Sequence, residues 1–317
     1  MTDFSLYNGY ETGFIDKNKK VLLPELNKKQ QEDLAPVQDK ADGIADYINY
    51  SIALSKSRRF PYFTASNIDG GLFRKVSRQD NWRRDDRIAA EHQWGNELYR
   101  SEKSDFDRGH LTKREDVQWG ESIAAASKAA DSTFYYSNSV PQHARLNQRI
   151  WRLLEDYILH TEARENGLKI CVFTGPVLSR KDPKFVTEVA GRVIQIPTLF
   201  WKVVVFPKSD DNLYRAGFMM SQESLLRDND IVESFRDLTL ETLTEEDDLF
   251  LEFEEADTYQ TNISTIEKLS GLKMPEAIDI YKDKRPVKLM LKEIDVRLES
   301  LDEAAKQLGF EIQGIML

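Results

Sequence analysis

The sequence predicts an α+β fold with a mixed, largely antiparallel central sheet flanked by helices. Runs rich in β-branched and aromatic residues predict strands at 169–174, 193–196, 199–206 and 214–220. Apolar residues at helical spacing predict helices over 146–163 and 264–272. These strand and helix signals alternate without a regular βαβ rhythm, which favours antiparallel pairing over a parallel sheet.

The remaining elements follow in chain order. The first 45 residues are polar with scattered apolar anchors, which indicates a strap too short to fold alone. Residues 47–67 predict two strands joined by a turn, and the arginine-rich stretch after them predicts a long functional loop with short helical pieces. A short strand at 134–137 should precede a turn containing Pro141. The helix over 146–163 should bury a stripe made of Ile150, Leu153, Leu154, Tyr157 and Ile158.

These signals divide the chain into three parts. They are an N-terminal strap at 1–45, a central domain at 46–282 and a C-terminal extension at 283–317. Residues 294–308 of the extension have an amphipathic pattern that predicts a helix. This helix would pack either on its own domain or against a partner.

The net charge of −10 conflicts at first sight with binding a polyanion. Residues 228–257 hold thirteen acidic residues and one basic residue, a net charge of −12, so the rest of the chain carries +2. The acidic segment is either a solvated loop or a site for an inhibitor or other partner protein. Arginines and lysines are frequent between residues 74 and 152, where they could line a positive groove.

Other bulk features narrow the class of protein. The single cysteine, Cys171, rules out an intramolecular disulfide framework and lies in an apolar run typical of a buried thiol. We expect no membrane-spanning segment, because no stretch reaches roughly 18 apolar residues. The N-terminal residues lack the pattern of a signal peptide, so we expect a cytoplasmic protein or one exported by a non-classical route.

Three residue types suited to phosphodiester hydrolysis occur within fifty residues of each other. His110 could act as a general base near neutral pH, and Asn147 offers a neutral oxygen to a hard cation such as Mg²⁺. Glu155 follows on the same predicted helix and could hold a metal-bound water. Each also has a structural alternative: a buried histidine, a helix cap and a surface glutamate.

The order of the motifs around these residues resembles the DNA/RNA non-specific endonuclease family, the ββα-metal or His-Me finger nucleases. The resemblance rests on the blocks Asp-Arg-Gly-His-Leu at 107–111 and Tyr-Ser-Asn-Ser-Val-Pro-Gln at 136–142. It continues with Asn147, Trp151 and Glu155, and with Thr-Gly-Pro at 174–176. No sequence feature resembles a P-loop, a zinc-finger cysteine spacing or a serine nucleophile elbow.

The resemblance implies an active site of the ββα-metal type that cuts DNA and RNA and leaves 5′-phosphate ends. His110 would be the general base, Asn147 the ligand of one Mg²⁺, with Mn²⁺ as a substitute, and Glu155 the helper acting through a bound water. Asp107 and Arg108 would brace the base or touch phosphate, and Asn138 and Gln142 would position the loop or the substrate. An upstream arginine would stabilise the transition state, with Arg83 or Arg84 preferred over Arg78 and Arg87. The resemblance also implies a homodimer.

Two other functions fit the same residues. A binding module could keep the fold and hold nucleic acid without cutting it, although the presence of His110, Asn147 and Glu155 argues against this. A restrained nuclease could serve as a toxin or defence effector whose acidic segment binds an inhibitor or shields the groove. If the protein is such a restrained nuclease, deletion of residues 228–257 would raise its activity.

Overall fold

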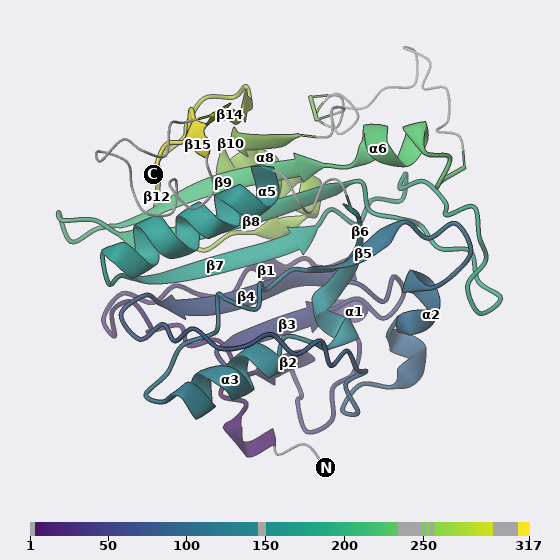
Figure 1. The fold of residues 1–317 in the computed structure, drawn as a ribbon, viewed down its shortest axis with the longest axis horizontal. Helices are drawn as coiled ribbons and strands as arrows, with labels where there is room; N and C mark the ends of the chain where they lie inside the picture. The colour runs from purple at the N-terminus through teal and green to yellow at the C-terminus, as the bar shows by residue number, and fades with distance from the viewer. Residues whose placement is uncertain (1–3, 145–149, 234–248, 250–251, 254–256, 294–309) are drawn as a thin grey trace.

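A computed structural model describes residues 4–144, 150–233, 249, 252–253, 257–293 and 310–317. Its main feature is one large twisted sheet that crosses the whole molecule (Figure 1). The order of the hydrogen-bonded strands is β13-β10-β9-β8-β7-β4-β3-β2, and β12 pairs with β9 at the side. All neighbouring pairs are antiparallel except β12 with β9, so the predicted mixed, largely antiparallel sheet is confirmed.

The strands of this sheet are β2 (Ile44–Tyr47), β3 (Tyr50–Leu54), β4 (Pro61–Asp69), β7 (Lys169–Pro176), β8 (Leu199–Pro207), β9 (Leu213–Ser221), β10 (Thr258–Thr261), β12 (Ile278–Asp279) and β13 (Val287–Lys288). Three two-stranded sheets accompany it: β1 (Glu25–Leu26) with β11 (Leu272–Lys273), β5 (Phe106–His110) with β6 (Ser139–His143), and β14 (Met290–Glu293) with β15 (Phe310–Gln313). The α-helices in the described residues are α1 (Lys28–Glu32), α2 (Asn96–Tyr99), α3 (Ile123–Asp131), α5 (Ile150–Asp156), α6 (Glu223–Asp228) and α8 (Ile263–Ser270).

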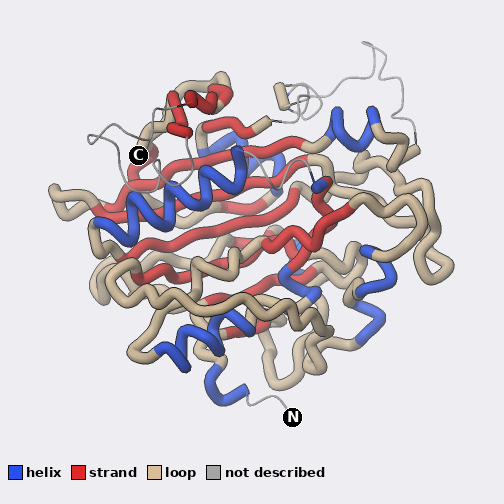
Figure 2. The backbone as a smooth tube through the Cα atoms, in the orientation of Figure 1, coloured by secondary structure: helices blue, strands red, loops and turns tan. Residues whose placement is uncertain are grey.

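Each face of the sheet has its own hydrophobic core. On the front face, α5 and the π-helix Tyr157–Glu165 lie along the strands, and Leu154, Ile158 and Leu159 pack on Ile170 and Val204 (Figure 2). The β5–β6 pair belongs to the same core through residues such as Phe106 and Val140. Because side chains of a strand alternate between faces, Cys171, Phe173 and Val203 point to the opposite core.

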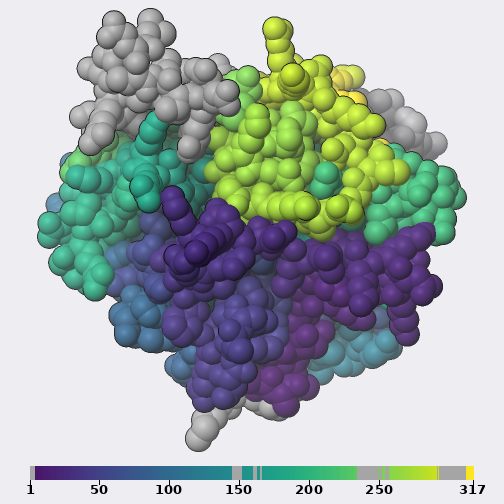
Figure 3. Space-filling model, turned by 180° about the vertical axis from the view of Figure 1, so that it is seen from behind, coloured from purple at the N-terminus to yellow at the C-terminus, as the bar shows by residue number. Residues whose placement is uncertain are grey.

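The back face is covered by the N-terminal strap and α8. Phe14, Val21 and Leu26 of the strap share a core with Ile263 and Ile266 of α8. The strap and the segment that contains α8 lie side by side on this surface (Figure 3). Strand β1 of the strap also pairs with β11. The strap is therefore joined by backbone pairing to the segment that follows α8. This arrangement leaves the opposite face for the β5–β6 pair and its surroundings.

Two predicted strands differ from the structure. The strand expected at 134–137 is replaced by β6 at Ser139–His143, and Pro141 lies inside β6 instead of in a turn. Proline fits there because β6 pairs only with β5, so its other edge needs no N–H donor. The strand expected at 193–196 is absent from the described structure, and only Gln195 makes an isolated bridge there. Val193 is exposed while Ile194 and Ile196 are buried, so the alternation of burial is that of a strand although the segment does not form one.

The predicted helices agree in position but differ in detail. The helix expected over 146–163 is found from Ile150 as α5 and continues as a π-helix to Glu165, and residues 145–149 lie outside the described residues. The helix expected at 264–272 is α8, which Asn262 caps and which ends at Gly271 with a positive φ of 69°. The amphipathic helix expected at 294–308 and most of the acidic segment 228–257 lie outside the described residues.

The predicted boundary at residue 283 does not coincide with a break in the sheet. Strand β13 pairs with β10 and therefore belongs to the central sheet. The described end of the chain is also attached to it, because the Met316 backbone exchanges two hydrogen bonds with the Gln260 side chain. Within the described residues, no helix is long and apolar enough to cross a membrane.

Candidate active site

Most of the predicted catalytic residues lie on or beside the β5–β6 pair, and Glu155 lies on α5. The predicted arginines Arg83, Arg84 and Arg87 lie in the loop between β4 and α2. Strands β5 and β6 are antiparallel, with Arg108 opposite Pro141 and His110 opposite Ser139. Asn138, which has no exposed surface, accepts a bond from the Thr112 backbone N–H at 3.0 Å and donates to the Thr112 and Thr133 carbonyls at 2.9 and 3.1 Å. Asn138 therefore fixes the backbone just after His110, and its amide does not face a substrate.

Gly109 in this strand is required by a close approach. A Cβ atom at this position would lie 2.2 Å from Oε1 of Gln142 and 2.5 Å from its Cγ. Gln142 is itself buried, directly opposite the half-buried Asp107. Gln142, predicted to touch substrate or position the loop, thus packs over the backbone beside His110.

The Gly109→Ala substitution tests this contact. The added methyl group must displace Gln142, and overpacking of this kind destabilises a fold by about 1–3 kcal/mol. We expect a lower melting temperature together with weaker activity, because the strand that carries His110 must shift. The double variant Gly109→Ala/Gln142→Ala should recover part of the loss in stability, and unchanged stability in the single variant would contradict the contact.

His110 is held in a largely apolar setting. Its ring lies 4.6 Å from the Trp82 ring and 5.1 Å from the Phe134 ring, centroid to centroid. Burial, followed by the positive charge of Arg78, lowers the pKa of His110 to about 3. The residue keeps some exposed surface, but its Nε2 atom is buried and has no hydrogen-bond partner among the described residues. The imidazole is therefore neutral at pH 7, and one ring nitrogen is available to accept a proton.

Glu155 of α5 lies beside a buried lysine that sequence reasoning missed. Lys202 Nζ of β8 is 3.3 Å from Glu155 Oε1 and 2.9 Å from the hydroxyl of Thr174 in the Thr-Gly-Pro block. Lys202 and Glu155 are both buried. Nearby, burial raises the pKa of Asp116 to about 7, although the charge of Lys202 opposes this shift. Lys202 lies in an apolar strand run, and nothing in that pattern marks it as different from the usual solvated lysine.

The structure describes one of the two residues predicted to serve the metal ion, Glu155. Asn147 lies outside the described residues, and the described residues contain no cluster of three histidine, cysteine or acidic side chains that would hold an ion by itself. Glu155 Oε1 is buried without a hydrogen bond among the described residues, so this carboxylate oxygen can still accept one. A neighbouring ammonium group at 3.3 Å disfavours direct coordination of a cation and favours action through a water. Mg²⁺ takes few protein ligands and keeps most of its water, so a single carboxylate that acts through water is compatible with it.

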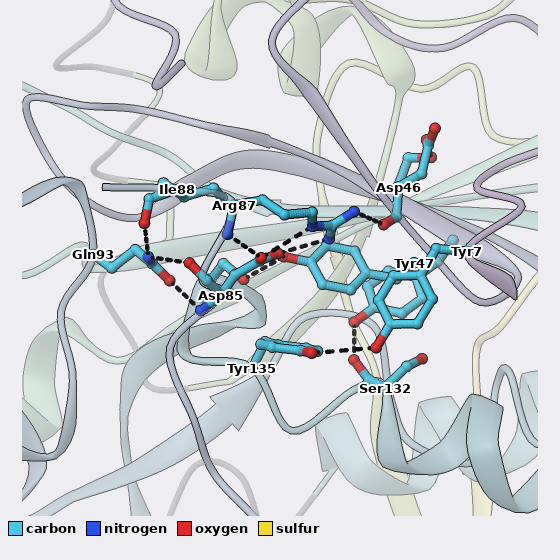
Figure 4. Close-up of polar contacts among 12 residues, drawn as sticks. Tyr7, Asp46, Tyr47, Asp85, Arg87, Ile88, Gln93, Ser132 and Tyr135 are labelled. Carbon is cyan, nitrogen blue, oxygen red and sulfur yellow. Dashed lines mark hydrogen bonds and ion pairs between the residues drawn. The ribbon is translucent and has the colours of Figure 1, made fainter. Parts of the chain in front are cut away.

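The arginines proposed for substrate binding have different surroundings. Arg87 is turned inward, where it forms an ion pair with buried Asp85 and stacks on Tyr47 (Figure 4). Its guanidinium also donates to the Asp46 carbonyl, so it supports the loop and does not face the surface. Arg83 pairs with Asp131 and lies over the Tyr135 ring, and the more exposed Arg84 pairs with Glu97.

Two other arginines lie close to the same site. Arg78 is largely exposed, pairs with the exposed Asp80, and lies 5.8 Å from the centroid of the Phe134 ring that contacts His110. Arg108 donates from Nη2 to Asn96 at 2.6 Å, while its buried Nε has no partner among the described residues. Arg78 therefore joins Arg83 and Arg84 as a candidate for the arginine beside the reacting phosphate.

An open cleft of about 630 Å³ lies beside His110, because Trp82 both lines the cleft and contacts the His110 ring. Its basic lining consists of Arg83, Arg84, Arg100 and Arg108, and its aromatic lining of Trp82 and Tyr136. Only Asp80 and Glu97 contribute carboxylates to it, so the cleft is positive overall despite the acidic chain.

Comparisons with known proteins agree with this site. The model of the DNA/RNA non-specific endonuclease family matches residues 30–279. A protein of Sinorhizobium fredii is 36% identical over 231 residues, which are 69% of this chain and 33% of that protein. Human mitochondrial endonuclease G is 33% identical over 149 residues, 45% of this chain and 47% of its own length. Nuclease C1 of Cunninghamella echinulata is 30% identical over 139 residues, 40% of this chain and 52% of its own length.

These matches span between a third and about half of the relatives' own lengths. A crystal structure of an EndoG/EndoGI complex aligns with 82% of this chain and 89% of its own at 20% identity and a TM-score of 0.48. Fold and site together define an α+β protein with a buried neutral histidine beside an arginine-lined cleft. With the family model matched over 30–279, the chain belongs to the DNA/RNA non-specific endonuclease family.

Proposed function

We propose that the protein is a metal-dependent endonuclease that hydrolyses phosphodiester bonds of DNA and RNA with little sequence specificity. The observation that carries the proposal is the partly buried, neutral His110, whose buried Nε2 has no partner among the described residues and which adjoins a positive cleft. Buried polar atoms are nearly always satisfied in folded proteins, so an unsatisfied nitrogen at this position is kept for a ligand or a reacting water.

His110 acts as the general base. Its neutral imidazole accepts a proton from the water that attacks phosphorus, and the negative charge of a bound phosphodiester raises its pKa toward the working pH. Asn138 and the Gly109–Gln142 contact hold the strand that aims it. Arg78 places a positive charge near the same point, where it opposes the negative charge that develops on the phosphoryl oxygens.

Asn147 and Glu155 would serve one Mg²⁺, with Asn147 as a ligand and Glu155 as the group that orients a nearby water. When bound, the ion would neutralise charge on the phosphoryl group and on the departing 3′ oxygen, leaving a 5′-phosphate end. Lys202 holds the Glu155 carboxylate in place from β8. Low base specificity follows if the contacts are to phosphate and sugar, because those groups carry no sequence information.

Metal removal tests the proposal. Purified protein is expected to nick supercoiled plasmid and to degrade structured RNA with Mg²⁺ or Mn²⁺, to stop in EDTA, and to recover when excess Mg²⁺ is added. Gel electrophoresis of both substrates gives the rates, and ligation of the products reports whether the 5′ ends carry phosphate. Cleavage that continues unchanged in EDTA would refute the metal requirement, and folded protein that binds but never cuts would refute the nuclease.

A further inference from the structure

The open cleft beside His110 is more than a positive surface, because a row of aromatic rings accompanies its cations. The ring centroids of Tyr99 and Tyr136 are 6.1 Å apart, those of Tyr136 and Trp82 are 5.7 Å apart, and those of Trp82 and His110 are 4.6 Å apart. Trp82 is half-buried, so part of its ring is accessible from the cleft that it lines. The row therefore leads from the cleft to the imidazole.

Positive charge accompanies this row on the cleft side. Arg100 follows the last residue of α2 and is exposed, and its side chain has no hydrogen bond or ion pair in the part of the chain that the structure describes. Arg108 is held over the rings of Trp82 and Tyr99 at 5.8 and 5.6 Å, and among the described residues its guanidinium bonds to the neutral amide of Asn96 and to no carboxylate. Two cations thus stand beside the aromatic surface with their charges available to an anion.

The lining of the cleft selects among nucleic acids. A protein that follows the backbone of a duplex needs a groove lined with cations, because the bases of a duplex are stacked and turned inward. This open cleft adds to its cations the accessible part of the Trp82 ring, a surface that an unpaired base can use and a stacked duplex base cannot. Aromatic side chains next to cations are the general means of holding a single strand, with bases stacked on the rings and phosphates on the cations.

We infer that this cleft is a subsite for an unpaired nucleotide next to the phosphodiester that is cut, with the base on Trp82 and its phosphate on Arg100 and Arg108. The inference rests on the proposed nuclease function and adds to it a substrate class. Single strands and unpaired loops fill the subsite directly, whereas a duplex must first expose a nucleotide at the expense of stacking and pairing. The protein is thus a nuclease that prefers unpaired DNA or RNA.

The test compares three labelled DNA oligonucleotides of one length: a single strand, the corresponding duplex, and a single strand with a central tract of tetrahydrofuran abasic units. The wild-type protein should show a kcat/KM on the single strand roughly ten-fold or more above that on the duplex. It should cut within the abasic tract roughly five- to hundred-fold more slowly than within the normal strand, because stacking is lost while the phosphates remain.

Variants then assign the effect to the cleft. Trp82→Leu should bring the rates on the normal and abasic strands close together, and Arg100→Ala should raise KM on both strands alike. Lys17→Ala, an exposed cation between Phe14 and Val21 of the back-face strap, is the matched control and should change nothing. Anisotropy of the single strand bound in EDTA gives a second readout, which does not depend on cleavage.

The outcomes are separable. A wild-type protein that cuts the duplex as fast as the single strand, or a Trp82→Leu protein that still discriminates against the abasic tract, overturns the subsite while leaving the nuclease intact. A folded wild-type protein that cuts none of the three substrates overturns the proposed function itself. Loss of discrimination in Trp82→Leu together with a raised KM in Arg100→Ala establishes the subsite.

Discussion

The His110→Ala variant is expected to cleave plasmid DNA and RNA about 10²- to 10⁴-fold more slowly than the wild type, the range for loss of a general base. The reason is the position of Nε2, which is buried and unpartnered among the described residues while the ring is neutral at pH 7. The measurement is kcat from the initial rate of nicking with saturating plasmid and Mg²⁺. His92→Ala is the matched control, since His92 lies on the surface turn Ala90–His92 and should behave as the wild type.

Stability gives the same variant a second readout. The folded-state pKa of His110, about 3, is below the value of about 6.5 in the unfolded chain, so the unfolded state binds the extra proton in between. Above pH 6.5 the histidine is neutral in both states and costs no stability. As the pH falls from 6.5 toward 3, the unfolded chain takes up a proton that the folded protein does not, so the free energy of unfolding falls. The His110→Ala protein should lose less stability than the wild type over that range. Equal acid sensitivity, or activity within ten-fold of the wild type, would remove His110 from its proposed role.

The second large effect is expected for Lys202→Met. Removing one partner of a buried ion pair leaves the other charge uncompensated, which typically costs about 3–5 kcal/mol. Here the remaining charge would be Glu155, whose exposed fraction is 9%, at the end of α5. We expect the free energy of unfolding, measured in urea, to fall by about that amount and the activity to fall with it.

A double-variant cycle separates the effect of breaking the Lys202–Glu155 ion pair from the effect of losing the lysine side chain. Lys202→Met combined with Glu155→Gln should recover much of the stability, because neither charge of the pair remains, but not the activity. Lys184→Met is the control: Lys184 lies 3.9 Å from Glu233 in an exposed pair, where a change of roughly 0–1 kcal/mol is typical. If Lys202→Met unfolds as the wild type does, then water reaches the pair and Glu155 is not held from β8.

The sequence predicted well those parts of the fold that local patterns specify. Strands β7, β8 and β9 are continuous apolar runs, and α8 carries both its cap and its terminating glycine in the sequence. The failure at 134–137 is instructive, because the aromatic residues there pack on Trp82 and the β2–β3 region and do not form a ladder. The ladder forms at Ser139–His143, a segment whose proline indicated a turn.

Within the site, motifs identified the residues of β5, β6 and α5 but not their partners. Nothing in the sequence distinguishes Arg87, which is committed to Asp85, from Arg78, which is exposed near His110, because that choice is made by contacts between distant segments. Lys202 and Trp82 were missed for the same reason: each gains its role from one neighbour in space, Glu155 and His110. The described residues leave Asn147, the acidic segment and the homodimer as predictions.

The back-face strap has a consequence for the order in which the chain folds during synthesis. Strand β1 pairs with β11, and the Gln30 side chain donates to the Ser270 carbonyl, so these contacts join segments 240 residues apart. The ribosome releases residues 106–156, with His110 and Glu155, long before β11 exists. Contacts of such long range slow folding, since a large loop must close before they form. We therefore expect the pairing of β1 with β11, which closes the back core, to be a late, slow step.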